Sequence, residues 1–201
     1  MIAQLGILRH RDTSGGGGTT PPVVGATLQL GTPGNLVYQL PIVYGEDYGK
    51  SAMIFTTAEL GAAKTITGIE VYFRSFPLPI SYPNQLIKMG NVTASQFDTT
   101  PDMSFSEVGL SGLITVKNTF NQLINTNNAW YNITFDTPFV YDGTKNLLLV
   151  WENNWGDWSS AVGGTSYMTA PNSVAKKSSF TFPVTGNGTV SSSRPVIKFH
   201  Y

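Results

Sequence analysis

Three tryptophans lie close together between residues 151 and 158, among amide and carboxylate side chains. The candidate ligand-binding residues of this segment are Trp155, Trp158, Asn153, Asn154 and Asp157. Aromatic rings cover the apolar face of a sugar, while amides and carboxylates bond to its hydroxyl groups. The segment therefore predicts a glycan-binding platform, and the polar loop at residues 44–48 is a second candidate. The alternative is that these rings serve packing, inside the domain or against a neighbouring subunit.

Residues suited to catalysis or metal binding are sparse. The chain has two histidines, His10 and His200, and no cysteine. Neither histidine has a visible nucleophile partner, and the two are too few for a transition-metal site. Carboxylate pairs such as Glu46 and Asp47 lack a setting that would raise one pKa, as a glycosidase requires. We predict a protein that is not an enzyme and that uses no cofactor and no metal.

Composition narrows the class of partner. The chain has 201 residues, a formal net charge of zero and only 12% charged residues, whereas nucleic-acid binding needs a basic excess. No apolar run reaches the ~20 residues that span a bilayer, so we expect no membrane insertion. An aromatic content of 12% argues against disorder. Abundant Gly, Thr, Ser and Asn favour an all-β fold with many turns.

The tryptophan segment follows a predicted β-hairpin that would position it. Tyr131, Ile133 and Phe135 alternate with polar residues, which is typical of a half-buried strand. Asp142-Gly143 has the composition of a tight turn. Residues 146–152 are apolar on both faces, so this strand is expected to be central and covered on both sides.

The remaining segments predict nine or ten short strands and two single-turn helices. The helices are expected at residues 56–61 and 93–97, where Thr and Glu or Gln have capping-box spacing. Residues 163–174 are expected to be turn-rich, and residues 178–184 to form a strand. Together the pattern predicts a two-sheet antiparallel β-sandwich, jelly-roll-like, over residues 25–201.

Residues 1–24 differ in composition from the rest and are expected to form an N-terminal arm. An apolar stretch is followed by basic residues and then by a Gly/Pro hinge, an order that does not indicate a secretory signal. We expect the arm to anchor the domain in a partner protein, and the alternatives are a disordered tail or an added strand. The candidate anchoring residues are Ile2, Leu5, Ile7, Leu8, Arg9 and Arg11.

Several segments together resemble a known family. IFTTAELGAAKTITGIEVYF, IKMGNVTASQF, WYNITFDTPFVYDGTKNLLLVW and RPVIKFHY occur in this order and span nearly all of residues 35–201. The set resembles a β-sandwich repeat of large surface adhesins from Bacteroidetes-type bacteria. The resemblance implies the fold and an association with adhesion and surface display. The matched residues lie mostly at core, turn and cap positions, so the resemblance carries little information about a ligand.

The arm and the single domain suggest a structural protein of a bacteriophage virion, such as a decoration, head-fibre or spike protein. The expected partners are other virion proteins through residues 1–24, further copies of the chain in a homo-oligomer, and a host-surface glycan or protein. The expected location is the virion. The main alternative is a bacterial cell-surface adhesin or carbohydrate-binding module, and a carbohydrate-active enzyme is the weakest reading.

Overall fold

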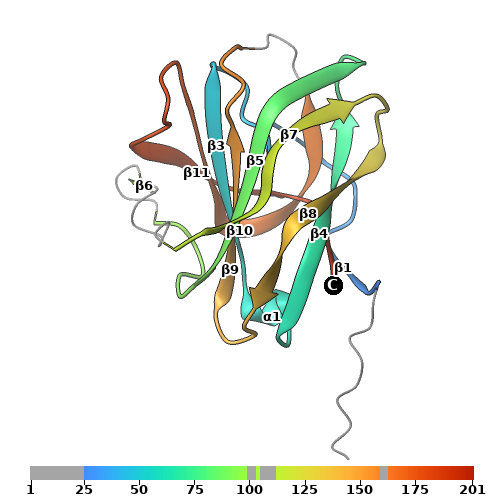
Figure 1. The fold of residues 1–201 in the computed structure, drawn as a ribbon, viewed down its shortest axis with the longest axis vertical. Coiled ribbons are helices and arrows are strands. Elements are labelled where there is room, and N and C mark those ends of the chain that lie inside the picture. The colour runs from blue at the N-terminus through green and yellow to red at the C-terminus, as the bar shows by residue number, and fades with distance from the viewer. Residues whose placement is uncertain (1–24, 99–102, 105–111, 159–162) are drawn as a thin grey trace, which may run out of the picture.

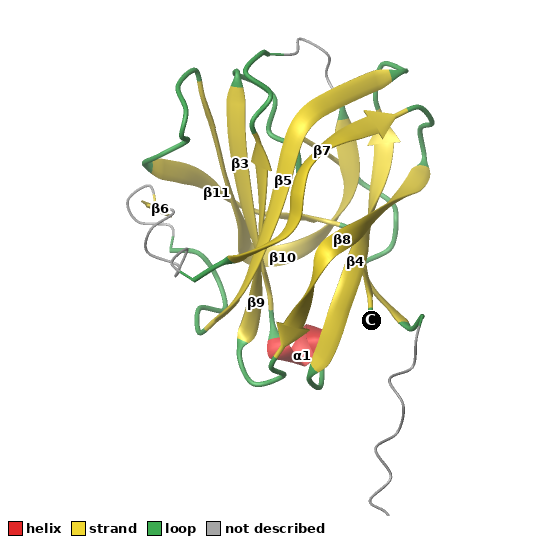
Figure 2. Cartoon of the chain, viewed as in Figure 1, coloured by secondary structure: helices red, strands yellow, loops and turns green. Residues whose placement is uncertain are grey.

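The computed structural model describes residues 25–98, 103–104, 112–158 and 163–201 (Figure 1). Within these ranges the fold is all-β, as predicted, and Figure 2 shows one short helix among the strands. No helix of the described ranges is long and apolar enough to cross a membrane. The elements are β1 (Thr27–Leu30), β2 (Leu36–Tyr38), β3 (Tyr48–Phe55), α1 (Thr57–Leu60), β4 (Lys64–Ser75), β5 (Ile80–Val92), β6 (Met103–Ser104), β7 (Ile114–Ile124), β8 (Ala129–Tyr141), β9 (Asn146–Asn153), β10 (Gly164–Ser179), β11 (Asn187–Pro195) and β12 (Ile197–His200).

The strands pair antiparallel along a path that runs β1-β12-β4-β10-β3-β9-β5-β7. Beside this path, β8 pairs with β4, β2 and β11 pair with β10, and β6 pairs with β11. Strands at the two ends of the path contribute to one core, to which β1 adds Leu30 and β7 adds Ile124. In the same core the rings of Phe55 on β3 and Phe199 on β12 meet edge to face, with centroids 5.0 Å apart. The outer strands β7 and β8 are linked by an ion pair of Lys117 with Asp136 at 2.6 Å.

β9 is the central strand that the sequence predicts. It lies between β3 and β5, and its apolar side chains are buried on both faces. Leu147, Leu149 and Trp151 belong to the main core. Leu148 and Val150 belong to a second cluster on the other face. Burying such side chains stabilises the fold by roughly 1.5–3 kcal/mol each, so β9 contributes to both clusters at once.

β8 and β9 do not form the predicted hairpin. β8 pairs with β4, whereas β9 pairs with β3 and β5. The connection therefore crosses from one group of strands to another. Asp142 Oδ1 accepts hydrogen bonds from the backbone N–H groups of Thr144 and Lys145 at 2.7 and 2.8 Å. Gly143 has φ +72°, and a Cβ there would lie 2.4 Å from the backbone nitrogen of Ala63, so the crossing requires glycine.

The sequence predictions for β10 are wrong. Residues 163–174 were expected to be turn-rich, and residues 178–184 to be a strand. Instead β10 is a strand of 16 residues, and the chain leaves it after Ser179. Its first part pairs with β2 and β4, and its last part pairs with β3. Pro171 and Asn172, the latter with φ +46°, lie between these pairings, so the turn-forming residues bend a strand instead of forming a loop.

Other strand boundaries also differ from the prediction. The composition of residues 35–43 predicts a strand, but only Leu36–Tyr38 forms one, and β1 before it has no counterpart in the prediction. Gln39 directly after β2 has φ +57°, which ends the extended conformation. Residues 113–117 and 120–124 predict two separate strands, but the chain forms the single strand β7 there.

α1 has the capping box that its sequence predicts. The Thr56 side chain accepts a hydrogen bond from the Glu59 N–H, and the Glu59 carboxylate accepts one from the Thr56 N–H at 2.8 Å. The second predicted helical turn, residues 93–97, is not helical. Its backbone bonds to other strands instead, since the Phe97 N–H donates to the Asn172 carbonyl at 2.7 Å and Asn146 Nδ2 donates to that of Ala94 at 3.0 Å.

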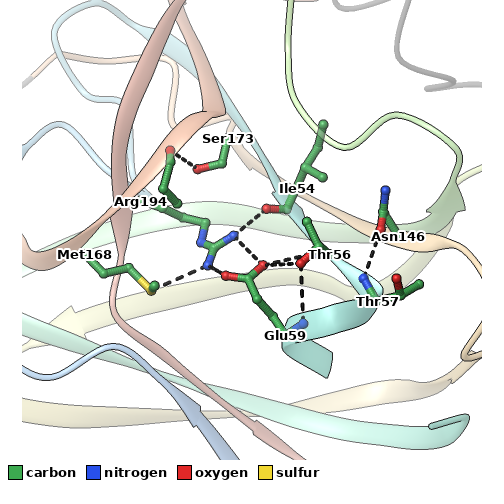
Figure 3. A network of polar contacts seen from close by, with 9 residues as sticks. Ile54, Thr56, Thr57, Glu59, Asn146, Met168, Ser173 and Arg194 are labelled. Carbon is green, nitrogen blue, oxygen red and sulfur yellow. Dashed lines mark hydrogen bonds and ion pairs between the residues drawn. The ribbon is translucent and has the colours of Figure 1, made fainter. Parts of the chain in front are cut away.

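Arg194 ties α1 to the end of β11 (Figure 3). Its side chain is 1% exposed and forms an ion pair with Glu59 through both terminal nitrogens. Nη1 also donates to the Ile54 carbonyl at 2.6 Å, and the guanidinium lies 4.4 Å from the ring centroid of Phe55. The arginine of the closing RPVIKFHY segment is thus a buried structural residue.

Candidate ligand-binding site

The loop after β9 is joined to the core by hydrogen bonds around Trp151. Trp151 is 1% exposed and Asn153 is fully buried. The indole N–H of Trp151 donates to Gln85 Oε1 at 2.8 Å, and Gln85 Nε2 donates to Asn153 Oδ1 at 2.6 Å. Asn153 Nδ2 donates to the Val43 carbonyl at 2.9 Å. Both polar ends of Asn153 are therefore bonded inside the protein.

A layer of aromatic rings supports the same loop. Trp155 is partly buried and meets Tyr82 edge to face, with ring centroids 5.8 Å apart. Tyr82 in turn lies 5.5 Å from Tyr44. The Tyr44 hydroxyl bonds to the backbone of Gly163, accepting from its N–H at 2.7 Å. Burial raises the pKa of both tyrosines, so the phenols remain neutral beneath the loop.

Exposed aromatic side chains lie outside this supporting layer. Trp158, Phe180 and Phe182 are 57%, 67% and 61% exposed. The ring of Tyr48 lies 5.5 Å from that of Phe182. We call these three exposed residues, together with the half-buried Tyr48, the aromatic end. Exposed aromatics in one region are typical of surfaces that bind a ligand or partner.

Strand register brings the loops of the aromatic end together. Tyr48 pairs with Ser179, the residue before Phe180, and Gly49 pairs with Asn153. The Gly156 N–H donates to the Asp47 carbonyl at 3.0 Å and links two of the loops directly. Because β3 ends next to α1, its first residue lies at the opposite end of the domain, where Figure 1 shows these loops.

The structure divides the predicted glycan-binding residues into two groups. Asn153 is in the core, and Trp155 packs on Tyr82. Trp158 and Asp157 are exposed and Asn154 is half-buried, so these three remain available to a ligand. The predicted anchoring residues, Ile2, Leu5, Ile7, Leu8, Arg9 and Arg11, lie outside the described residues. Glycan binding and anchoring stay predictions.

The sequence prediction does not include Phe180 and Phe182 among the candidate site residues, because it assigns residues 178–184 to a strand. The useful signal is Pro183 directly after them, since proline is unfavourable inside a paired strand. Two aromatic residues beside a proline and a Gly-Asn-Gly turn are better explained as an exposed loop. The 44–48 loop was noted as a second candidate, and the structure joins it to the first.

Two carboxylates near this end have partners within the protein. Glu152 forms ion pairs with Lys50 and Lys88 at 3.6 and 3.0 Å. Asp157 accepts a hydrogen bond from the Trp158 N–H at 2.8 Å. In the part of the chain that the structure describes, no group of three or more His, Asp or Glu side chains could hold a metal ion. The arrangement offers aromatic faces with polar neighbours, which is chemistry for binding.

No protein-family model matches this chain, and no curated protein matches it either.

Proposed function

We propose that this chain is a non-enzymatic attachment module, in which a jelly-roll-like β-sandwich presents the aromatic end to a glycan on a host surface. The module would belong to a bacteriophage virion as a decoration, head-fibre or spike protein. The antiparallel all-β fold with its shared core supports the sandwich reading.

The observation that carries the proposal is the convergence of three loops over a buried aromatic layer: two of them carry exposed aromatic side chains, and the third carries the half-buried Tyr48. Trp158 and Phe182 are more than half exposed, although burial would stabilise such large rings. The hydrogen bonds of Asn153 and Tyr44 hold the loops beneath them. A preorganised aromatic surface loses little conformational entropy when it binds a sugar ring.

The place where residues 1–24 join the domain also supports display of the aromatic end on a surface. Residues 1–24 join the domain at Gly25, and the neighbouring Ala26 accepts a hydrogen bond from the Tyr201 N–H at 2.9 Å. Lys64 lies 4.3 Å from the Tyr201 ring centroid and donates to the Leu60 carbonyl of α1 at 2.6 Å. The junction is therefore at the α1 end, away from the aromatic end (Figure 1). An anchor at this junction would direct the aromatic end outward.

Trp158→Ala and Phe182→Ala are each expected to weaken glycan binding about tenfold, because each removes a ring worth at least ~1.4 kcal/mol at a binding surface. The measurement is binding to an array of bacterial surface polysaccharides, followed by titration of the glycans that bind. Val140→Ala is the matched control, since Val140 is 69% exposed on β8 and pairs with Thr65 near α1. Unchanged affinity in both aromatic variants would contradict the proposal.

Removal of residues 1–20 is expected to abolish incorporation into virus particles while the domain still folds. The quantity to measure is the copy number of the chain in purified particles by mass spectrometry, with circular dichroism as the check on folding. A truncated chain that is still incorporated would refute the anchoring role. A full-length chain found only with washed cell surfaces would favour the bacterial adhesin alternative.

A further inference from the structure

A polar cleft lies on the β10–β11 side of the domain. Its volume is about 360 Å³, at the lower end of the range for small-molecule pockets. Side chains that line the cleft are those of Gln39, Val43, Lys176, Lys177, Ser178, Asn187 and Thr189. No acidic residue lines the cleft among the described residues, so amides, hydroxyls and two lysines dominate its surface.

Lys176 and Lys177 both line the cleft, and Lys176 is the candidate partner for an anion. Val174 faces the main core and Ala175 faces the second cluster, so strand alternation places Lys176 on the core side of β10 and Lys177 on the other side. Lys176 Nζ donates to the Tyr38 carbonyl at 3.4 Å. In the described part of the chain it has no ion-pair partner, and burial lowers its pKa. A partly buried ammonium with one long hydrogen bond is suited to an anionic group.

Gln39 gives a second, independent indication. Its φ of +57° lies in the left-handed region, which glutamine rarely adopts. Strained backbone of this kind is often retained at ligand sites. Gln39 lines the cleft together with Lys176.

Cleft residues adjoin the loops of the aromatic end along the chain. Val43 of the cleft precedes the loop that leads to Tyr48, and Asn187 of the cleft follows the loop that carries Phe182. Ser178 of the cleft is next to Ser179, which pairs with Tyr48.

We propose that this cleft binds the carboxylate of an acidic sugar, with Lys176 as the cationic partner and Gln39 and Asn187 as hydrogen-bonding neighbours. The inference rests on the proposed function and specifies its ligand class as an acidic glycan. Contacts with the neutral aromatic rings would supply most of the affinity, and the cleft would favour a negatively charged sugar over a neutral one.

The test titrates trigalacturonic acid and its methyl ester into the full chain by calorimetry. The acid is expected to bind about tenfold more tightly than the ester, as one charge-assisted hydrogen bond provides. Lys176→Gln is expected to remove this preference. Lys145→Gln, which changes the same charge at an exposed position in the β8–β9 connection, is expected to keep it.

Several outcomes would overturn the inference. Equal binding of acid and ester, with loss in Trp158→Ala but not in Lys176→Gln, would refute the cleft and leave the aromatic end as the glycan site. A preference for acid that persists in Lys176→Gln would refute the role of Lys176. Absence of binding by either form would refute the cleft, while the polysaccharide array decides the proposed function separately.

Discussion

Arg194→Ala is expected to lower the free energy of unfolding by about 3 kcal/mol, near the lower limit for removing one partner of a buried ion pair. Arg194 is almost fully buried, and its loss removes a donor from the Ile54 carbonyl and leaves the Glu59 carboxylate with Thr56 as its remaining donor. The Glu59 side chain keeps 25% exposure, so water relieves part of the penalty. Urea denaturation measures the change.

Lys145→Ala is the control for this variant. Its side chain is exposed in the β8–β9 connection, so the expected change is within ~0.5 kcal/mol. A loss below about 1 kcal/mol in Arg194→Ala would show that the ion pair contributes no more than a surface pair does.

The pH dependence of stability gives a second readout of the same network. Burial opposes ionisation of Glu59, but hydrogen bonds from Arg194 and Thr56 outweigh it and hold the pKa of this carboxyl below its usual value. Since the folded-state pKa is the lower one, the stabilisation is complete above the unfolded pKa of about 4.3 and is lost as the pH falls through the folded pKa. Stability of the wild type should therefore fall more steeply with acid than that of Glu59→Gln.

The local sequence pattern was sufficient to predict a strand wherever its hydrophobic residues show which face is buried. In β4, Ile69, Val71 and Phe73 are buried as their alternation predicts, and β9 is central as its two apolar faces predict. Pairing could not be predicted in the same way. Asp142-Gly143 has the composition of a hairpin turn, but the choice between a hairpin and a crossing depends on distant strands.

The same limit applies to the candidate site. The exposure of Trp158 could be predicted, because it follows from a local feature, a tryptophan in a loop that contains Gly156 and Asp157. The burial of Asn153 depends on Gln85, 68 positions away, and on the Val43 carbonyl. The contact of Phe182 with Tyr48 depends on the pairing of β10 with β3, which sets Ser179 opposite Tyr48. Only the folded chain reveals these two facts.

Asn153→Ala is expected to lower the free energy of unfolding by about 3 kcal/mol, because it leaves buried groups without partners that cost roughly 1–3 kcal/mol each. These groups are the Val43 carbonyl, Gln85 Nε2, which keeps its bond to the Pro83 carbonyl, and the Trp155 N–H, which donates to Asn153 Oδ1 at 3.3 Å. Asn154→Ala is the matched control, since the hydrogen bond of Asn154 to Asn84 uses its backbone N–H. The control is expected to change stability by less than ~0.5 kcal/mol.

Thermal denaturation and glycan binding, measured on the same two variants, separate a structural role of Asn153 from the glycan-binding role that the sequence predicts for both asparagines. If Asn153 acts through the core, its variant loses stability first, and binding is lost only in proportion to the unfolded fraction. If Asn153 instead contacts the sugar, its variant melts like the wild type and fails to bind. The second result would contradict the hydrogen-bond network around Trp151, and with it the rigid support that makes the aromatic end a preorganised surface.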